Sequence, residues 1–354
     1  MRLRIEARNA TIGVHRGRIV ASDAPFDVVI RVPDGDLHPG LINSHDHLHR
    51  NHFGRLGHPP YEDAYAWGRD IQATDAAAIA AGRARPRRSA LLEGAWKNLF
   101  AGVTTVVHHD SWESDFERAF PIRVVRMHSI HSLRLATSAE AWSPPPGPFA
   151  VHLAEGTNAA ASDEIRELAR RGLVGPDLLA VHVVGADADG VALLRAAGAA
   201  IVWCPASNLF LFGETAPETL LADGIDVLLG TDSLLTGSPT LLDELRCARA
   251  QQRASDARLL DAVGRVAARR LGLPVPSLEV GAPADVAIFR APPFEATVAD
   301  VALVMVDGQL RVLDPTLVSA LGTAASRGHN AARFGVTRWV GADASVAHVR
   351  SVEP

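Results

Sequence analysis

Cysteine, long apolar runs and runs of like charge are all scarce in this chain of 354 residues. The two cysteines, Cys204 and Cys247, are too few for a disulfide scaffold. No apolar segment approaches the roughly 18 residues of a membrane span, so no membrane partner is expected. The formal charge of −5 is spread along the chain, which argues against a nucleic-acid partner. The start MRLRIEARNATIG is polar and alternating, unlike a signal peptide, so we expect a cytoplasmic protein.

Apolar residues make up 47% of the chain, enough for one large domain with or without a small one. Residues 1–36 hold short alternating runs separated by turn residues, which is typical of antiparallel strands. Over residues 37–276 strand-like runs alternate with helical stretches, which predicts a parallel sheet closed into a (β/α) barrel of the TIM type. Residues 277–315 return to short strands and predict a small β-sandwich together with residues 1–36. Residues 316–354 are interpreted as a further helix and an irregular tail without an assigned role.

The expected helices of the barrel are long segments of helical pattern between the strand-like runs. They lie near residues 72–100, 113–120, 161–172, 188–197, 215–222 and 239–272.

Polar residues stand at the ends of several apolar runs. In LINSHDHLH, His45 and His47 alternate, so on a strand both side chains point to the same face. His152 ends the run FAVHLAEG, His182 ends LLAVHVVG, and Asp232 ends DVLLGTDS. Barrel enzymes build their active sites at the carboxyl ends of the strands. We therefore expect these side chains to meet in one site.

Three imidazoles and one carboxylate form a mixed nitrogen and oxygen donor set that suits zinc or iron(II). A bound divalent metal lowers the pKa of its water to about 7. Glu155, three residues after His152, would take the proton from that water and pass it to the leaving nitrogen. His182 would hydrogen-bond the attacking oxygen or the developing charge of the substrate. The expected cofactor is one divalent metal ion per chain, held by His45, His47, His152 and Asp232.

Each of these signals has a plainer interpretation when it is taken alone. A lone histidine such as His182 is commonly a hydrogen-bonded core residue, and a lone HxH pair is weak evidence for a metal. GTDS is also consistent with a turn in which Asp232 caps a helix, and HxxE arises by chance. Four such coincidences in chain order, each at the end of a strand, favour the metal site.

Together these motifs resemble the amidohydrolase superfamily. PGLINSHDHLH resembles its first-strand signature PGxxxxHxH, and LLEGAWKNLFAGVTTVVHHD resembles its second-strand segment. VHLAEG, VHVVG, VWCPASNLFLFG and VLLGTDSLLTGSPTLLDELRCA follow in family order. They are similar to the branch of cytosine, S-adenosylhomocysteine, aminofutalosine and guanine deaminases and the triazine chlorohydrolases. SLEVGAPADVAIF and LVMVDGQLRVLDP resemble the second half of that branch's β-sandwich, so the resemblance covers roughly residues 1–315.

The resemblance implies the same metal ligands as the donor chemistry. His45 and His47 match the first-strand ligands, His152 matches the fifth-strand ligand, and Asp232 matches the last-strand aspartate, a ligand and base toward the metal water. Many other amidohydrolases hold two metals bridged by a carboxylated lysine on the fourth strand. The only lysine here, Lys97, lies on the helix before the second strand. Composition therefore excludes a lysine-bridged pair, and one metal is expected.

The resemblance also implies roles for residues around the metal. Glu155 matches the proton-shuttling glutamate of the HxxE motif, and His182 matches the sixth-strand histidine that contacts the hydrolytic water or the substrate. Asn208, in PASN, matches a loop residue near the site. A homodimer would be ordinary for this branch.

Further substrate-binding candidates come from the residues alone. Trp67 falls in the loop after the first strand, where it would stack on a flat heterocycle or pack a lid. His108 and His109 end the second strand, so one faces inward and one outward; the alternative is a buried, hydrogen-bonded histidine. His131, at the end of the third strand, would bind an anionic or carbonyl group or lie at the surface.

One segment is short for this branch. Only 43 residues, 109–151, separate His108 from His152, where relatives have room for two further strand–helix units. We expect one barrel unit to be lost or much reduced, which puts the substrate wall in doubt.

The sequence thus predicts a metal-dependent hydrolase of C–N bonds, with hydrolytic deamination of a purine, pyrimidine, pterin or nucleoside-type substrate as the first hypothesis. An amide, ring-opening or dechlorinating hydrolase with the same site is the first alternative. A barrel that binds a small molecule without turnover is the alternative from another class. Zinc is the expected metal, with iron(II) as the alternative.

Overall fold

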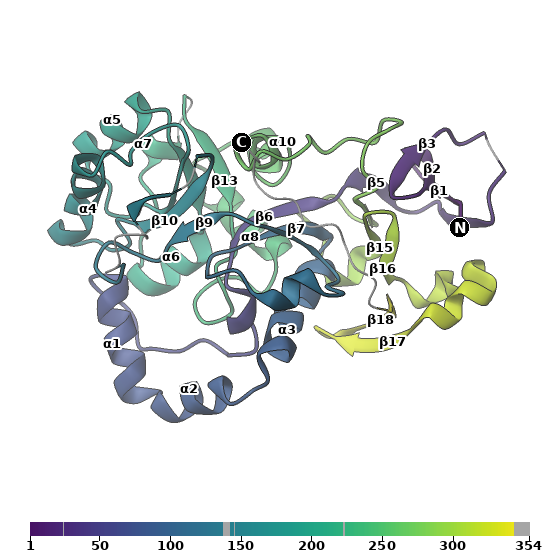
Figure 1. The fold of residues 1–354 in the computed structure, drawn as a ribbon, viewed down its shortest axis with the longest axis horizontal. Helices are drawn as coiled ribbons and strands as arrows, with labels where there is room; N and C mark the ends of the chain where they lie inside the picture. Colours follow the sequence, from purple (N-terminus) through teal and green to yellow (C-terminus); the bar gives the residue numbers. More distant parts are fainter. Residues whose placement is uncertain (24, 137–141, 145, 222–223, 343–354) are drawn as a thin grey trace.

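The structure is a computed structural model, and it describes all residues except 24, 137–141, 145, 222–223 and 343–354. Two parts lie side by side in Figure 1, with the parallel strands and most helices on the left and the antiparallel strands on the right. Within the described part of the chain, no helix has the length and apolar character that crossing a membrane requires.

The left-hand part contains two parallel sheets. The first has three strands in the order β6 (Leu41–Asp46), β7 (Val103–His108) and β8 (Arg123–Val125). The second has five strands in the order β13 (Asp226–Leu229), β12 (Ala200–Trp203), β11 (Leu178–His182), β10 (Phe149–Leu153) and β9 (His128–Ile130). Most of these strand residues are buried, as expected for parallel strands covered on both faces.

The two parallel sheets meet at two seams. At one seam a parallel bridge pairs Asp46, at the end of β6, with Asp232, just after β13. At the other seam, β8 and β9 are separated by only two residues, yet β8 pairs with β7 and β9 pairs with β10. A crossover between two parallel strands needs a dozen or more residues. β8 and β9 are therefore halves of one segment, Arg123–Ile130, and one strand–helix unit is reduced, as the short spacing predicted. The backbone hydrogen-bond pairing between neighbouring strands is therefore interrupted at both seams, and the two sheets do not form one continuous barrel sheet.

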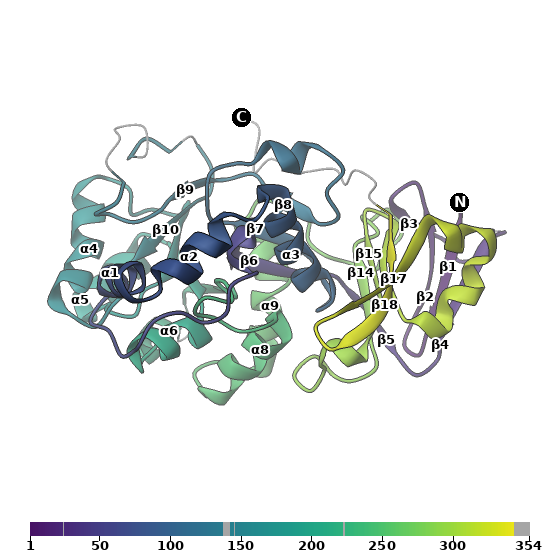
Figure 2. The same ribbon diagram turned by 90° about the horizontal axis from the view of Figure 1, so that it is seen from below.

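Helices lie around these sheets (Figures 1 and 2). They are α1 (Ala64–Thr74), α2 (Ala76–Arg83), α3 (Arg87–Leu99), α4 (Ala159–Arg170), α5 (Ala188–Ala196), α6 (Pro205–Phe212), α7 (Glu218–Leu221), α8 (Leu241–Ala250), α9 (Asp256–Ala262) and α10 (Arg265–Arg270). The single helix expected near 72–100 is three helices, because Asp75 departs from helical backbone angles and Pro86 precedes α3. The helix expected near 113–120 is one 3₁₀ turn, Ser114–Glu117.

Two antiparallel sheets make up the right-hand part. The first has the order β3 (Arg18–Val20), β2 (Thr11–His15), β1 (Leu3–Ala7) and β4 (Val28–Val32), with β1 and β4 parallel. The second has the order β17 (Gly328–Arg333), β18 (Val336–Gly341), β16 (Gln309–Leu313), β15 (Val301–Val306), β14 (Val286–Phe289) and β5 (Asp36–Pro39). Apolar side chains from both sheets share one buried core.

Part of the predicted tail belongs to this second sheet. Residues 315–327 form 3₁₀ helix over Pro315–Arg327, and β17 and β18 then extend the sheet beyond β16. Trp339 of β18 packs into the shared core. Residues 343–354 of the predicted tail lie outside the described residues.

Candidate metal centre

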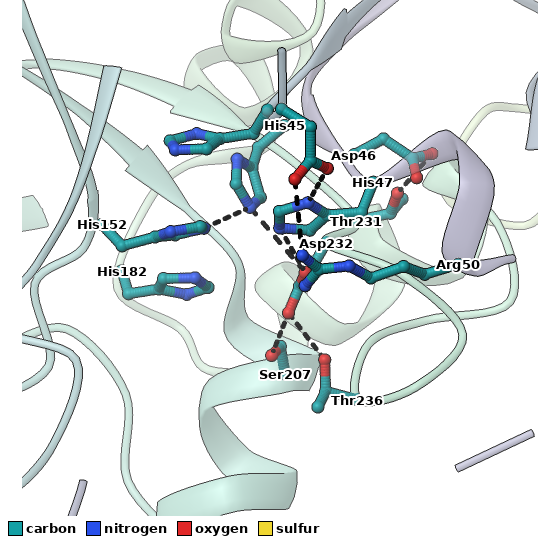
Figure 3. Close-up of polar contacts among 12 residues, drawn as sticks. His45, Asp46, His47, Arg50, His152, His182, Ser207, Thr231, Asp232 and Thr236 are labelled. Atoms are coloured by element: carbon teal, nitrogen blue, oxygen red, sulfur yellow. Dashed lines mark hydrogen bonds and ion pairs between the residues drawn. The ribbon is translucent and has the colours of Figure 1, made fainter. Parts of the chain in front are cut away.

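Four side chains converge at the carboxyl ends of the parallel strands (Figure 3). His45 lies on β6 and His47 directly follows it, His152 lies on β10, and Asp232 follows β13. All four side chains are buried. Nε2 of His45 lies 3.2 Å from Nε2 of His152 and 3.8 Å from Oδ1 of Asp232. The same Oδ1 lies 3.6 Å from Nε2 of His47.

Hydrogen bonds made by Nδ1 fix the tautomers of the His47 and His152 rings. Nδ1 of His47 lies 2.6 Å from Oδ2 of Asp110, and Nδ1 of His152 lies 2.5 Å from the main-chain oxygen of His131. A carboxylate or carbonyl oxygen can only accept, so both Nδ1 atoms donate and the Nε2 atoms of the neutral rings hold lone pairs.

This arrangement fits a divalent cation. Nitrogen lone pairs and a carboxylate oxygen that face one another repel unless a positive charge lies among them. Three imidazole nitrogens and one carboxylate oxygen are donors that zinc and iron(II) accept. Groups of His, Asp and Glu side chains close enough to hold a metal include His45 with His47 and Asp232, and His45 with His109 and His152.

Asp232 is oriented by its second oxygen. Oδ2 accepts hydrogen bonds from Ser207 at 2.7 Å and Thr236 at 2.6 Å, which leaves Oδ1 facing the histidines. Burial opposes ionisation of this carboxyl, but its electrostatic interactions with His47 and His182 and these hydrogen bonds outweigh burial and lower its pKa. The carboxylate form is therefore the one that faces the cluster.

Glu155 and His182 form a second pair beside the four candidate ligands. Oε1 of Glu155 lies 3.6 Å from Nε2 of His182. Burial raises the pKa of Glu155 to about 7, with His182 lowering it and Asp232 raising it. A carboxyl that titrates near neutral pH is suited to general acid and base catalysis.

Asn208 sets the orientation of His182. Its Nδ2 donates to Thr215 at 3.2 Å, so its Oδ1 faces His182 and accepts from Nδ1 at 2.9 Å. Nε2 of the neutral His182 ring is then an acceptor that faces Glu155.

Four residues at these strand ends adopt left-handed backbone angles. The φ angles are 49° at Ala154, 71° at His182, 47° at Val183 and 58° at Asp232. Such angles are uncommon for residues other than glycine and cluster at functional sites.

A cavity of about 910 Å³ opens above the cluster. His47, His152, Glu155, His182 and Asp232 line it. The two predicted substrate contacts Trp67 and His131 also line it, together with other residues of α1 and α2. These two helices therefore provide a large part of the wall.

The other three predicted substrate contacts do not line this cavity. Asn208 is buried beneath His182, as described above. His108 is buried, and its Nδ1 accepts from the main-chain N–H of Leu48 at 3.2 Å. His109 is buried against the rings of His45 and His152, with centroids 4.8 and 4.0 Å away.

A buried polar network behind the candidate ligands was not predicted. Asp46, between the two histidines of the HxH pair, faces away from the cluster and lies 3.2 Å from Nζ of Lys97. Asn51 and Asn98 also donate to its carboxylate, at 2.7 and 2.8 Å. Nζ of Lys97 donates in turn to Asn51 and Thr231. The only lysine thus supports the first strand.

Asp110 was also missed. It is the last residue of the quoted segment LLEGAWKNLFAGVTTVVHHD, where a carboxylate after a strand end is a natural partner for a ligating histidine.

The fold and the cluster together define a parallel α/β protein with a candidate metal site at its strand ends. The sequence model of the protein family described as "Amidohydrolase family" matches residues 106–311, more than half of the chain. The chain belongs to that family.

Two curated relatives are named 5-methylthioadenosine/S-adenosylhomocysteine deaminase. The protein from Halobacterium salinarum is 34% identical over 167 residues, 40% of this chain and 39% of that relative. The protein from Teredinibacter turnerae is 35% identical over 134 residues, 34% of this chain and 30% of that relative. The chain spans less than half the length of the curated relatives that it matches.

Two similar solved structures contain zinc. One is an adenosine deaminase from Xanthomonas campestris, with a TM-score of 0.68, 20% identity, and coverage of 92% of this chain and 97% of that one. The other is atrazine chlorohydrolase from Arthrobacter aurescens, with a TM-score of 0.65, 20% identity, and coverage of 91% and 99%. They establish the likeness of the fold.

Proposed function

We propose that this chain is a metal-dependent hydrolase that deaminates an aminated heterocycle. The observation that carries the proposal is the pairing of a buried N₃O donor cluster with Glu155, whose pKa is raised to about 7, on the floor of one cavity. The names of the curated relatives support deamination, and their heterocycles are purines.

In this proposal one metal ion is held by His45, His47, His152 and Asp232. Zinc is the first choice, because similar structures carry it, and iron(II) is the alternative for the same donors. A divalent metal supplies Lewis acidity, which lowers the pKa of water to about 7.

The side chains of the site move the protons of the reaction. Glu155 accepts a proton from the attacking water and delivers it to the ring nitrogen beside the amino-bearing carbon. The new C–O bond forms at that carbon, and the C–N bond to the amino group breaks. The amino group leaves as ammonia after it has gained the second proton of the water. His182 accepts a hydrogen bond at Nε2 and orients the attacking water, while Asn208 holds its ring.

The first test is ammonia release from zinc-loaded protein across amino-purines, amino-pyrimidines, pterins and their nucleosides. The proposal expects at least one substrate whose turnover is lost in Glu155→Gln. A fall of about 10²–10⁴ is typical when a general acid or base is removed. Glu167→Gln is the matched control, because Glu167 pairs with Arg171 on the surface of α4.

Dechlorination is a second candidate, because the fold is shared with atrazine chlorohydrolase. Release of chloride without ammonia would replace the first proposal with this one. Release of neither product, with binding that Glu155→Gln leaves unchanged, would identify a binding protein instead.

A further inference from the structure

His109 follows the last residue of β7 and lies against the metal ligands. Its main-chain N–H donates to the main-chain oxygen of Asp46 at 3.0 Å, which holds this position beside the end of β6. Its side chain is 1% exposed and does not line the cavity. Contact with substrate therefore does not explain a histidine here.

A hydrogen bond fixes the tautomer of His109. Nε2 lies 3.2 Å from the main-chain oxygen of Ile130, so it carries the proton and donates. The lone pair is then on Nδ1. That atom is buried, and the residues that the structure describes offer it no hydrogen-bond partner.

His109 forms a close group with two of the candidate ligands. One ring nitrogen each of His45, His109 and His152 lie within 4.8 Å of one another, and His45 also belongs to the group with His47 and Asp232. The rings of His109 and His152 lie face to face, with centroids 4.0 Å apart and an interplanar angle of 24°. Nδ1 of His152 already donates to His131, so His152 has no proton to offer His109.

We propose that Nδ1 of His109 is an additional ligand of the metal ion, which gives the site four imidazoles and one carboxylate. The inference rests on the proposed function only for the presence of the metal. Five protein donors and one water require six positions. Zinc in proteins is mostly four- or five-coordinate, so this shell favours a metal that accepts six ligands, such as iron(II).

The test uses cobalt(II) as the bound metal, because its visible absorption strengthens as its coordination number falls. His109→Phe keeps a ring to stack on His152 and removes the nitrogen. We expect stronger cobalt absorption and an affinity for cobalt(II) and zinc that is at least about tenfold lower, because even partners outside the ligand set are worth 10–100-fold. His58→Phe is the matched control, because the side chain of His58 is exposed, pairs with Asp70 and does not line the cavity, so it should leave the cobalt spectrum unchanged. Equal spectra and affinities in His109→Phe and the control would overturn the proposal.

A measurement on the unaltered chain makes the test independent of whether His109→Phe folds. In the proton spectrum of the cobalt-loaded protein, each ligating imidazole gives one strongly shifted N–H signal. Four such signals support His109 as a ligand. Three signals with metal bound overturn this proposal and leave the proposed hydrolase intact. Failure of the chain to bind any divalent metal would overturn both.

Discussion

At the scale of single residues, the raised pKa of Glu155 makes the free energy of unfolding depend on pH, and the direction of that dependence follows from the shift. Its pKa is raised to about 7 in the folded chain from an ordinary value of 4.5. The unfolded chain loses this proton near pH 4.5, while the folded chain keeps it until about pH 7. The contribution to stability is therefore complete below pH 4.5 and is lost as the pH rises through 7.

We expect Glu155→Gln to gain stability relative to the unaltered protein between pH 5 and pH 8, by about 1–3 kcal/mol, because each pKa unit corresponds to 1.36 kcal/mol. The measurement is urea unfolding of both metal-free proteins at the two pH values. A difference that does not change with pH would show that the carboxyl titrates normally. A bound cation favours the carboxylate, so added metal should reduce the effect.

Asp110 fixes the tautomer of one ligand. Without its carboxylate, Nδ1 of His47 has no acceptor to hold its proton outward. We expect Asp110→Ala to weaken metal binding by about 10–100-fold, measured by competition with a chelator. Asp163→Ala, at an exposed position of α4, should bind metal as the unaltered chain does. Equal affinities in the two variants would mean that the ring needs no partner.

The residues of the donor cluster could be predicted because each stands at the end of an apolar run, where its position implies its direction. His108 and His109 show the limit of that reasoning. Adjacent strand residues face opposite sides, but the pattern alone does not say which of the two faces the metal. Only the pairing of β7 with β6, and the contact of His109 with Ile130 of β9, place His109 against the rings of His45 and His152 and His108 beside Leu48.

At the scale of elements, β6 and α3 are joined through a buried ion pair. Asp46 and Lys97 are each no more than 1% exposed. Removing one partner leaves an uncompensated buried charge, which commonly costs 3–5 kcal/mol.

We therefore expect Lys97→Met to lower the free energy of unfolding by about 3–5 kcal/mol. The double variant Asp46→Asn/Lys97→Met should recover much of the loss, because no buried charge remains. The measurement is a double-mutant cycle by urea unfolding, completed with Asp46→Asn. Losses that simply add would show that the two side chains do not interact.

The same scale shows why helix boundaries were harder to predict than strands. The segment 72–100 is rich in alanine and has a helical pattern over most of its length. Its breaks depend on single residues, Asp75 and Pro86, and on the need of α1 and α2 to cover the cavity. Packing against distant parts of the chain cannot be deduced from a short segment of sequence.

At the scale of the whole molecule, the reduced barrel unit was predicted from the small number of residues between His108 and His152. The strands at 328–341 were not predicted. The sequence GHNAAR of β17 has no alternation of apolar and polar residues. It is a strand because it pairs with β18 along its length. β18 in turn places Trp339 in the core that both antiparallel sheets share.

Substitution of Trp339 tests whether the stability of the molecule and the metal affinity of the site are independent. Its side chain is 4% exposed, and its Nε1 donates to the main-chain oxygen of Ala325 at 3.1 Å. Truncation of a buried tryptophan costs about 3–5 kcal/mol. We expect Trp339→Ala to lose that much in urea unfolding, yet to bind metal with unchanged affinity under conditions where it stays folded. Trp339 lies in the core of the antiparallel sheets, on the opposite side of the molecule from β10, which carries His152 (Figure 1), so we expect the donor cluster to keep its geometry. A metal affinity that falls together with stability would show that the antiparallel sheets act on the ligands through β5 and β6.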